Sequence, residues 1–448
     1  MAEVWFSSAV ELVERLRRRE VSAVEVLDAH AERIARYNPS LVAVVSADLD
    51  RARQAAAEAD RRLARDGTAG PLHGAPMVLK DGHDVAGMRT TLGTDVYDRV
   101  PDQDGTVAAR LRAAGAIIVG HSNVPPFLAQ YRTENEIFGR SGNPWDPRRT
   151  PGGSSGGGAA AVAAGLAAAD VGSDYGGSLR LPPHFCGVYG LMATERRVPA
   201  TGFWRPLDGR ARTTRILMSF GPMARDVADL DLVLRVIAGP DGRDGEVPPV
   251  PLCERRSVAT AGLRLAVAPA LPGAEVAAPL RAQVERVAVR ASDAGAHVTE
   301  RLPKVDWGQQ RFSGELMSAA TAVFDPDAVL PDAHRELAWY LRVLDRRDRF
   351  RAAWHDFFAE YDALVTPPGT TTAFVHDSMA DEGQERQLVF ANFAGLPVLT
   401  APAGHDGAGL PIGVQIVGPP WSEVRLVEIA HALEESGILP GFTPPPGY

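Results

Sequence analysis

A stretch of alanine and other apolar residues (159–169) constrains the fold of this chain more than any other feature. It is too short to span a bilayer and has no polar face, so it predicts a helix that is buried on all sides. A Gly/Ser-rich run (152–158) opens directly into it, and a second Gly/Ser-rich loop (172–180) follows it. The chain must therefore fold into a body large enough to enclose this segment.

Composition and charge exclude several classes of protein. The 448 residues are 45% hydrophobic and 23% charged, which is typical of a globular protein and excludes a disordered chain. The net charge of −9 argues against a nucleic-acid surface, and the two cysteines, Cys186 and Cys253, exclude a disulfide framework and a cysteine-based zinc site. There is no long apolar run, and residues 1–20 lack the apolar core of a signal peptide. We therefore expect a cytoplasmic protein with no nucleic-acid or membrane partner.

The order of the predicted elements is that of an α/β fold. Three helices are expected in residues 1–70, the second ending at Asn38–Pro39 and the third at Gly67. The looser stretch 239–251 is a candidate linker, and length alone favours two or three domains. Strands are predicted at 77–79, 117–119, 263–267, 297–302, 363–366, 398–401 and 412–417, and further helices at 106–114, 279–294, 307–358 and 422–435.

The Gly/Ser run around Ser154 matches known motifs only in part. Residues 152–156 have the G-x-S-x-G pattern of a nucleophile elbow, but proline-rich sequence rather than a strand precedes them. The missing strand also excludes a dinucleotide fingerprint, and no Lys-Ser/Thr follows the glycines as a phosphate loop requires. A flexible linker would not usually open directly into an apolar helix. The 11 histidines show no metal-ligand spacing, and although a Ser-His-Asp triad stays open, no histidine is singled out for it.

Only two of the 47 basic residues are lysines, Lys80 and Lys304. Because arginine serves elsewhere in the chain wherever a positive charge is needed, a retained lysine indicates chemistry that requires the loss of its proton. Lys304, in the polar stretch 301–306, is best explained as a chance residue, whereas Lys80 ends a predicted strand. A buried amine with a lowered pKa can remove the proton of a serine hydroxyl. The glycines before Ser178 leave backbone N–H groups free to hold an oxyanion.

Taken together, these motifs resemble the amidase signature family over nearly the whole length of the chain. The residues that carry the resemblance are 70–81 (GPLHGAPMVLKD), 113–123 (AAGAIIVGHSN), 133–147 (TENEIFGRSGNPWDP), 150–167 (TPGGSSGGGAAAVAAGLA), 172–182 (GSDYGGSLRLP), 185–191 (FCGVYGL), 221–230 (GPMARDVADL), 364–368 (LVTPP) and 409–419 (GLPIGVQIVGP).

The resemblance implies a Lys–cis-Ser–Ser triad that needs no cofactor and no metal. Position by position, Lys80 is the base, Ser154 is the bridging serine after a cis peptide bond from Gly153, and Ser178 is the nucleophile. The oxyanion hole and the supporting positions of the family fall on the backbone amides of Tyr175, Gly176, Gly177 and Ser178, and on Ser155 and Arg180.

The resemblance also implies a single α/β domain (1–448) with a large mixed central β-sheet surrounded by helices, which overrides the expectation from length. Within it we expect N-terminal helices packed on the core (1–70) and a catalytic signature core (70–235). A C-terminal part (236–448) would complete the sheet and the substrate pocket.

The implied function is hydrolysis of the C–N bond of a small-molecule amide through an acyl-enzyme. An amide-forming acyltransferase, in which an amine replaces water, uses the same acyl-enzyme and is the alternative. A glutaminase-type amidotransferase subunit ranks lower, because residues 123–130 depart from the segment expected there, and a non-catalytic binding module ranks last, because the full triad is present. Association into a homodimer is left open. Departures from the family pattern that concern the substrate lie at His121, Pro126, Tyr175 and 192–196.

Overall fold

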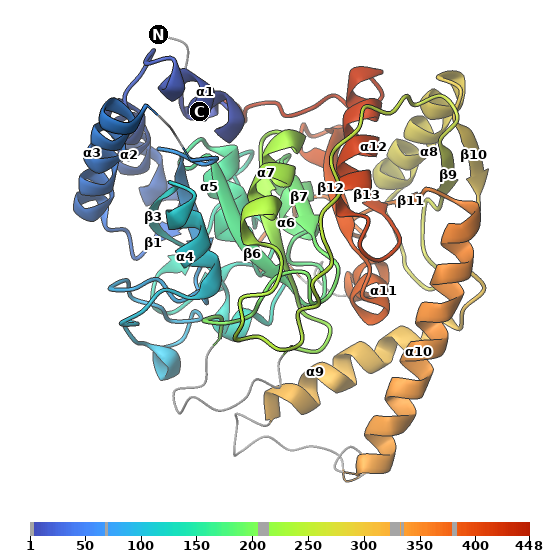
Figure 1. Ribbon diagram of the computed structural model, residues 1–448. Coiled ribbons are helices and arrows are strands. Elements are labelled where there is room, and N and C mark those ends of the chain that lie inside the picture. The colour runs from blue at the N-terminus through green and yellow to red at the C-terminus, as the bar shows by residue number, and fades with distance from the viewer. Residues whose placement is uncertain (1–3, 68–69, 205–214, 323–331, 333–335, 379–382) are drawn as a thin grey trace.

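The structure, a computed structural model, describes residues 4–67, 70–204, 215–322, 332, 336–378 and 383–448 (Figure 1). These residues form a mixed sheet of 11 strands in the order β1-β3-β2-β6-β8-β7-β12-β13-β11-β9-β10. Helices surround this sheet, so the expected single α/β domain with a large mixed central sheet is confirmed (Figure 1). The strands are β1 (Val44–Val45), β2 (Pro76–Lys80), β3 (Ile117–Ser122), β6 (Ala169–Asp174), β7 (Tyr189–Met192), β8 (Ser219–Ala224), β9 (Arg264–Val267), β10 (His297–Glu300), β11 (Ala363–Thr366), β12 (Val398–His405) and β13 (Pro411–Val417).

The N-terminal part contains three helices, as predicted: α1 (Ala9–Arg17), α2 (Ala23–Leu41) and α3 (Leu49–Asp66). The predicted end of α2 at Asn38–Pro39 is wrong, because Pro39 lies inside the helix. Proline removes only its own N–H donor, and the helix continues past it because the Asn38 carbonyl still accepts the N–H of Val42.

The apolar stretch 159–169 is buried as predicted, but it is not one helix. Helix α5 (Gly156–Ala163) ends in the middle of it, Gly165 follows with a φ of +69°, and the last residue already belongs to β6. Because α5 and β6 are both enclosed on all sides, the same run of small apolar residues passes from the helix to the first residue of the strand, and composition does not mark where one ends and the other begins. For the same reason the predicted loop 172–180 begins as a strand, and the buried strands β7 and β8 have no sequence signal of their own.

The C-terminal part follows the predicted order closely. Strands β9 to β13 lie at the predicted positions, with ends that differ by a few residues. The predicted helical stretch 307–358 is divided into several helices, and most of its residues 323–335 lie outside the described part of the chain. The further helices are α4 (Thr106–Ala113), α6 (Leu181–Cys186), α7 (Val227–Ile237), α8 (Ala278–Asp293), η4 (Trp307–Arg311), α9 (Phe312–Ala322), α10 (Leu337–Glu360), α11 (Glu385–Ala394) and α12 (Glu423–Glu435).

The candidate linker 239–251 does not connect two domains. Arg110 donates hydrogen bonds to the carbonyl oxygens of Gly239 and Pro240, at the start of the stretch. Arg197 donates to the carbonyl of Val250 near its end. Arginine side chains therefore bind this stretch to the surface of the single domain.

The packing of α5 across the sheet determines where functional side chains can gather. This helix contacts β2, β3, β6 and β8, and β2 runs parallel to both β3 and β6. The carboxyl ends of β2, β3 and β6 consequently meet at one edge, next to the loop that leads into α5. Among the described residues, no helix combines the length and apolar character that crossing a bilayer demands.

Candidate active site

Lys80 is the last residue of β2, a strand in which every residue is buried. Its Nζ atom lies 2.7 Å from Oγ of Ser154 and 3.2 Å from the carbonyl oxygen of Ser173. Burial lowers the pKa of Lys80 to about 7, although the carboxyl groups of Asp174 and Asp170 act in the opposite direction. A substantial share of the Lys80 side chains is therefore uncharged near neutral pH, as a proton acceptor has to be.

Ser154 lies in the loop that leads into α5, and the Gly153–Ser154 peptide bond is cis, as expected. Its Oγ atom lies 2.9 Å from Oγ of Ser178, and its backbone N–H donates a second hydrogen bond of 2.9 Å to the same Ser178 atom. Lys80, Ser154 and Ser178 are all buried. An amine and two hydroxyls thus follow one another at hydrogen-bond distance.

Ser178 belongs to the tight turn that connects β6 with α6. Gly177 in this turn has a φ of +129°, and a Cβ atom at this position would lie 2.5 Å from Cδ1 of Leu388, so only glycine fits. The N–H of Gly177 donates to Oδ1 of Asp174 at 2.8 Å, and the Tyr131 hydroxyl donates to the carbonyl of Gly176 at 2.9 Å. The turn is therefore held from two sides beside the reactive hydroxyl.

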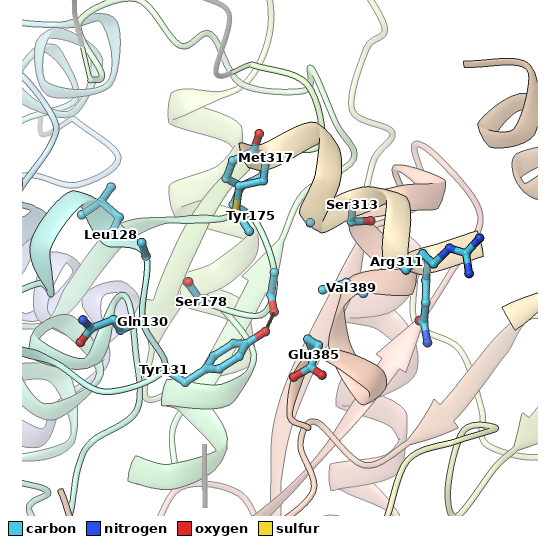
Figure 2. Close-up of a pocket in the computed structure, with 14 residues that line it drawn as sticks. Leu128, Gln130, Tyr131, Tyr175, Ser178, Arg311, Ser313, Met317, Glu385 and Val389 are labelled. Atoms are coloured by element: carbon cyan, nitrogen blue, oxygen red, sulfur yellow. Dashed lines mark hydrogen bonds between the residues drawn. The ribbon is translucent and has the colours of Figure 1, made fainter. Parts of the chain in front are cut away.

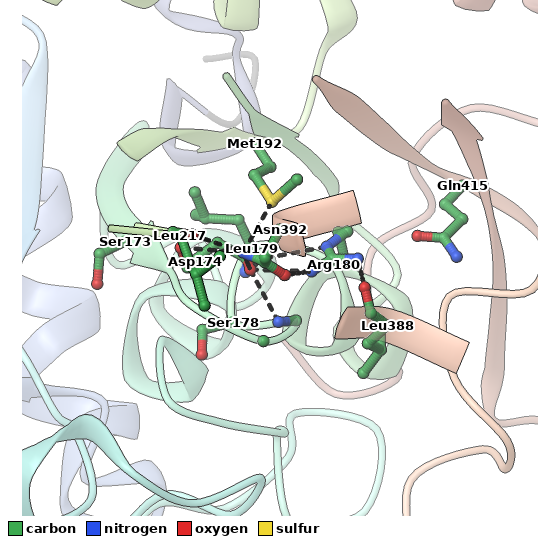
Figure 3. A network of polar contacts seen from close by, with 12 residues as sticks. Ser173, Asp174, Ser178, Leu179, Arg180, Met192, Leu217, Leu388, Asn392 and Gln415 are labelled. Atoms are coloured by element: carbon green, nitrogen blue, oxygen red, sulfur yellow. Dashed lines mark hydrogen bonds and ion pairs between the residues drawn. The ribbon is translucent and has the colours of Figure 1, made fainter. Parts of the chain in front are cut away.

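A buried polar network lies directly behind this turn (Figure 3). Arg180 and Asp174 form an ion pair of 2.9 Å with both side chains fully buried, and Arg180 also donates to the carbonyl of Leu388 and to Oδ1 of Asn392. Burial on its own would raise the pKa of Asp174, but the guanidinium of Arg180 lowers it below the ordinary value. The Asp174 carboxylate therefore stays charged and anchors the turn.

The residues expected to support the triad lie against it. The Ser155 hydroxyl donates to the carbonyl oxygen of Ser173 at 3.3 Å, which is the oxygen that Lys80 also contacts. Arg180 acts on the turn through Asp174, as described above. The Gly177 amide, expected in the oxyanion hole, is engaged by Asp174 in this structure.

A pocket of about 410 Å³ opens beside Ser178 (Figure 2). The charged residues that line it are Arg311 and Glu385, and Figure 2 shows the Arg311 side chain extending away from Ser178. Most of the other side chains that line it are aromatic or aliphatic, namely Leu128, Ala129, Tyr131, Tyr175, Met317 and Val389.

Two of the departures from the family pattern bear on this pocket. Tyr175 lines it, and Pro126 begins the short helix η3 (Pro126–Leu128), which brings Leu128 to its wall. His121 is buried elsewhere, with its ring nitrogens 3.1 Å from the carbonyl of Leu79 and 3.3 Å from Oγ1 of Thr90. In the described part of the chain, no three His, Cys, Asp or Glu side chains are placed to hold a metal ion.

Three polar residues around the triad escape sequence reasoning: Asp170, Asp174 and Asn392. Asp174 carries a usable signal, because an aspartate inside a Gly/Ser turn commonly accepts backbone N–H groups. Asn392 lies on α11, more than two hundred positions from Asp174 and Arg180, and nothing in its own segment distinguishes it. Asp170 lies between the predicted helix (159–169) and the predicted loop (172–180), in a position for which the sequence predicts no element.

A mixed α/β sheet thus brings an amine and two hydroxyls into hydrogen-bond succession beside a pocket, an arrangement suited to nucleophilic chemistry by a serine in an α/β protein. Comparison with protein families makes this assignment specific. The Amidase family model matches residues 25–329 and 309–427. The chain belongs to the amidase signature family, whose enzymes act on C–N bonds.

Several known proteins are similar to this chain over nearly its whole length. A glutamyl-tRNA(Gln) amidotransferase subunit from Synechococcus sp. (strain CC9605) is 34% identical, with 94% of this chain and 95% of the relative covered. The corresponding protein of Moorella thermoacetica is 33% identical, with 97% of each chain covered. An inhibitor-bound structure described as a vestigial complex related to an s-triazine catabolic enzyme is 27% identical with a TM-score of 0.85, covering 97% of this chain and 99% of that one.

Proposed function

We propose that this protein hydrolyses the C–N bond of a small-molecule amide through an acyl-enzyme on Ser178. The observation that carries the proposal is the unbroken succession of contacts from Nζ of Lys80 through Oγ of Ser154 to Oγ of Ser178, with distances of 2.7 and 2.9 Å. A serine hydroxyl is a weak nucleophile until a base removes its proton, and an uncharged buried amine is such a base.

The proton moves along this succession in both directions. When Oγ of Ser178 attacks the amide carbonyl, its proton passes to Ser154 while the Ser154 proton passes to Lys80. The C–N bond then breaks, and Ser154 returns a proton to the departing amine while Lys80 replaces the proton of Ser154. Water repeats the sequence against the Ser178 ester, which releases the carboxylic acid and restores the free hydroxyl.

The developing oxyanion lies next to the backbone amides of the turn. Because the Gly177 N–H is already bonded to Asp174, we assign the oxyanion hole mainly to the amides of Tyr175, Gly176 and Ser178. The hydrogen bond from Tyr131 to the Gly176 carbonyl orients this part of the turn. A fixed set of N–H donors stabilises charge that forms only in the transition state.

The pocket supports a substrate whose amide carries an apolar group. Leu128, Tyr131, Tyr175, Met317 and Val389 line the pocket together with Ser178 (Figure 2). Apolar walls of this kind gain free energy by excluding water from an aryl or alkyl substituent.

A second candidate, the glutaminase subunit of a tRNA-dependent amidotransferase, is favoured by the names of the similar curated proteins. Glutamine presents an ammonium and a carboxylate, and Glu385 and Arg311 are charged residues of the pocket that could pair with them. Such a subunit would act in a complex with other protein chains. A homodimer, by contrast, is compatible with either candidate.

The two candidates are separated by a substrate panel of anilides, alkyl amides and L-glutamine, with the released amine or ammonia measured. The primary proposal expects turnover of an apolar amide by the isolated chain and little release of ammonia from glutamine. Glutamine hydrolysis that is lost in both Arg311→Ala and Glu385→Ala, with no turnover of apolar amides, would overturn it in favour of the second candidate. Added hydroxylamine, which traps an acyl-enzyme as a hydroxamate, reports the shared intermediate in either case.

A further inference from the structure

A second buried carboxyl group lies on the same face of the sheet as Lys80. Asp170 of β6 is paired in register with Val78 of β2, and Lys80 lies two residues further along β2. Ser122 of β3 is paired in register with Lys80. Because side chains two residues apart on a strand point to the same face, Ser122, Lys80 and Asp170 project from three adjacent strands toward α5.

A hydrogen bond crosses above β2 and links the two flanking residues. The Ser122 hydroxyl donates to Oδ1 of Asp170 at 2.9 Å, and both side chains are fully buried. The other carboxyl oxygen, Oδ2, is also buried and has no hydrogen-bond partner among the described residues. A buried carboxyl oxygen without a partner is unfavourable unless a nearby charge compensates it.

The first turn of α5 is shaped around this carboxyl group. A Cβ atom at Gly158 would lie 2.5 Å from both Cγ and Oδ2 of Asp170, so the carboxyl group fits only because residue 158 is glycine. Residue 158 therefore has to be glycine for Asp170 to fit, although the triad as described does not use Asp170. Lys80 and Asp170 act on one another electrostatically, each favouring the charged form of the other.

We infer that Asp170 is a positioning residue that acts through Lys80, stabilising the ammonium that Lys80 becomes when it takes the serine proton; this inference rests on the proposed function. A carboxylate held on the same face by Ser122 opposes the cost of creating a buried positive charge. The negative charge at Asp170 therefore makes Lys80 a stronger base than burial alone would allow.

Other titratable groups also lie around Lys80. Asp174 favours the charged form of Lys80 as well, but its carboxylate is shared with the guanidinium of Arg180. His83, beyond the end of β2, is fully buried, and burial lowers its pKa to about 3, so it is uncharged. Helix α5 contributes no titratable side chain, and on β3 the ring of His121 contacts Leu79 and Thr90 instead. Burial raises the pKa of Asp170 itself to about 7, while Ser122 and Lys80 lower it, so its charge responds to Lys80 in the working pH range.

The test measures the pH dependence of Ser178 modification by a fluorophosphonate, with the full chain and no need to know the substrate. In the wild type the modification rate rises with pH as Lys80 loses its proton. In Asp170→Asn we expect the midpoint of this rise to move to lower pH by about one unit or more, because an adjacent opposite charge shifts a pKa by that amount. The rate on the high-pH plateau should fall, because the weaker base removes the serine proton more slowly.

The matched control is Asp229→Asn. Asp229 is also a buried carboxyl whose pKa burial raises to about 7, but it accepts the N–H groups of Ala9 and Val10, and Lys80 is not among the groups that act on it. Its variant should keep the wild-type midpoint. A midpoint that is unchanged in Asp170→Asn, or that moves equally in Asp229→Asn, would overturn the inference.

Ser122→Ala provides a second variant in case Asp170→Asn does not fold. Loss of the Ser122 hydrogen bond favours the protonated form of Asp170, so the midpoint should again move to lower pH, and an unchanged midpoint would also overturn the inference. The proposed function fails separately: a wild-type chain that is not labelled at Ser178, or whose labelling shows no rise with pH, refutes the triad itself. If the wild type is labelled at Ser178 with a rate that rises with pH, and Asp170→Asn has the same midpoint, only the role of Asp170 is refuted.

Discussion

Ser154 makes two hydrogen bonds to the same atom, Oγ of Ser178: one of 2.9 Å from its backbone N–H and one of 2.9 Å between the hydroxyl oxygens. The N–H and the hydroxyl of Ser154 both donate to the Ser178 oxygen, and together they fix the position of that oxygen. The hydroxyl of Ser154 in turn lies 2.7 Å from Nζ of Lys80. One residue thus orients the nucleophile and connects it to the base.

Replacement of Lys80 by arginine should abolish turnover although the charge is kept. Arginine cannot give up its proton at working pH, so it cannot accept one from Ser154. We expect amide hydrolysis to fall at least about 100-fold, the usual contribution of a general base. Lys304→Arg is the matched control, because it changes the other lysine, which is exposed. Activity in Lys80→Arg within tenfold of the control would show that Lys80 is merely structural.

Ser178 should be the residue that a fluorophosphonate modifies. Its hydroxyl is the one that both lies at the pocket and is connected to Lys80 through Ser154. Mass spectrometry of the digested adduct should locate it on the peptide that contains Ser178, and Ser178→Ala should lose labelling and at least about a thousandfold in turnover. An adduct on Ser154 or Ser155 instead would reverse the assigned roles of the serines.

The pH dependence of kcat/KM should follow Lys80. Burial lowers its pKa to about 7, and only the uncharged amine accepts a proton, so activity should rise with pH up to about 7 and then level off. Below that value the rate should fall about tenfold for each pH unit, since a single proton must be lost. A histidine base would give a similar midpoint, but that rise would persist in Lys80→Arg, which the Lys80 assignment forbids.

The sequence predicts the outer framework of this fold better than its centre. Strand β11 is predicted at its observed ends because it is a short apolar run next to Pro367 and Pro368, and α12 is predicted within a residue. The centre is harder, since α5 and β6 are both enclosed and one run of small apolar residues passes from the helix into the strand. An element that is buried on all sides has no polar face, so the alternation of polar and apolar residues that identifies a helix or a strand is missing.

The triad residues are recognisable from the chain because each lies in a distinctive local setting: Lys80 as a rare lysine, and Ser154 and Ser178 beside glycines. Residues that act through tertiary contacts have no such setting. Asn392 reaches the turn from α11. Asp170 lies in a fully buried strand, and its role depends on the pairing of β2 with β6. The register of the strands and the position of α11 determine these contacts. Neither can be read from the local sequence.

Asn392→Ala should destabilise the protein and weaken catalysis without touching the triad. The Asn392 side chain donates to Oδ1 of Asp174 at 3.0 Å and to the carbonyl of Leu217, and accepts from Arg180, all in the interior. Its loss leaves buried polar atoms without partners, which costs about 1–3 kcal/mol. Urea unfolding followed by circular dichroism measures this cost. A fully stable variant would show that Arg180 alone is sufficient to hold Asp174.

Two neighbouring glycines of the nucleophile turn should respond differently to the same added methyl group. Gly177 has a φ of +129°, and its added Cβ would lie 2.5 Å from Leu388, so Gly177→Ala should lower the free energy of unfolding by about 1–3 kcal/mol and displace Ser178. At Gly176 the added Cβ would meet the Tyr131 hydroxyl and Val389 at 3.6 Å, an ordinary contact. Gly176→Ala should therefore keep the stability of the wild type. Equal melting temperatures for both variants would contradict the turn geometry. A large loss of fluorophosphonate labelling in Gly177→Ala alone would support it. In that variant the backbone has to shift, and the shift moves the Ser178 hydroxyl away from Ser154.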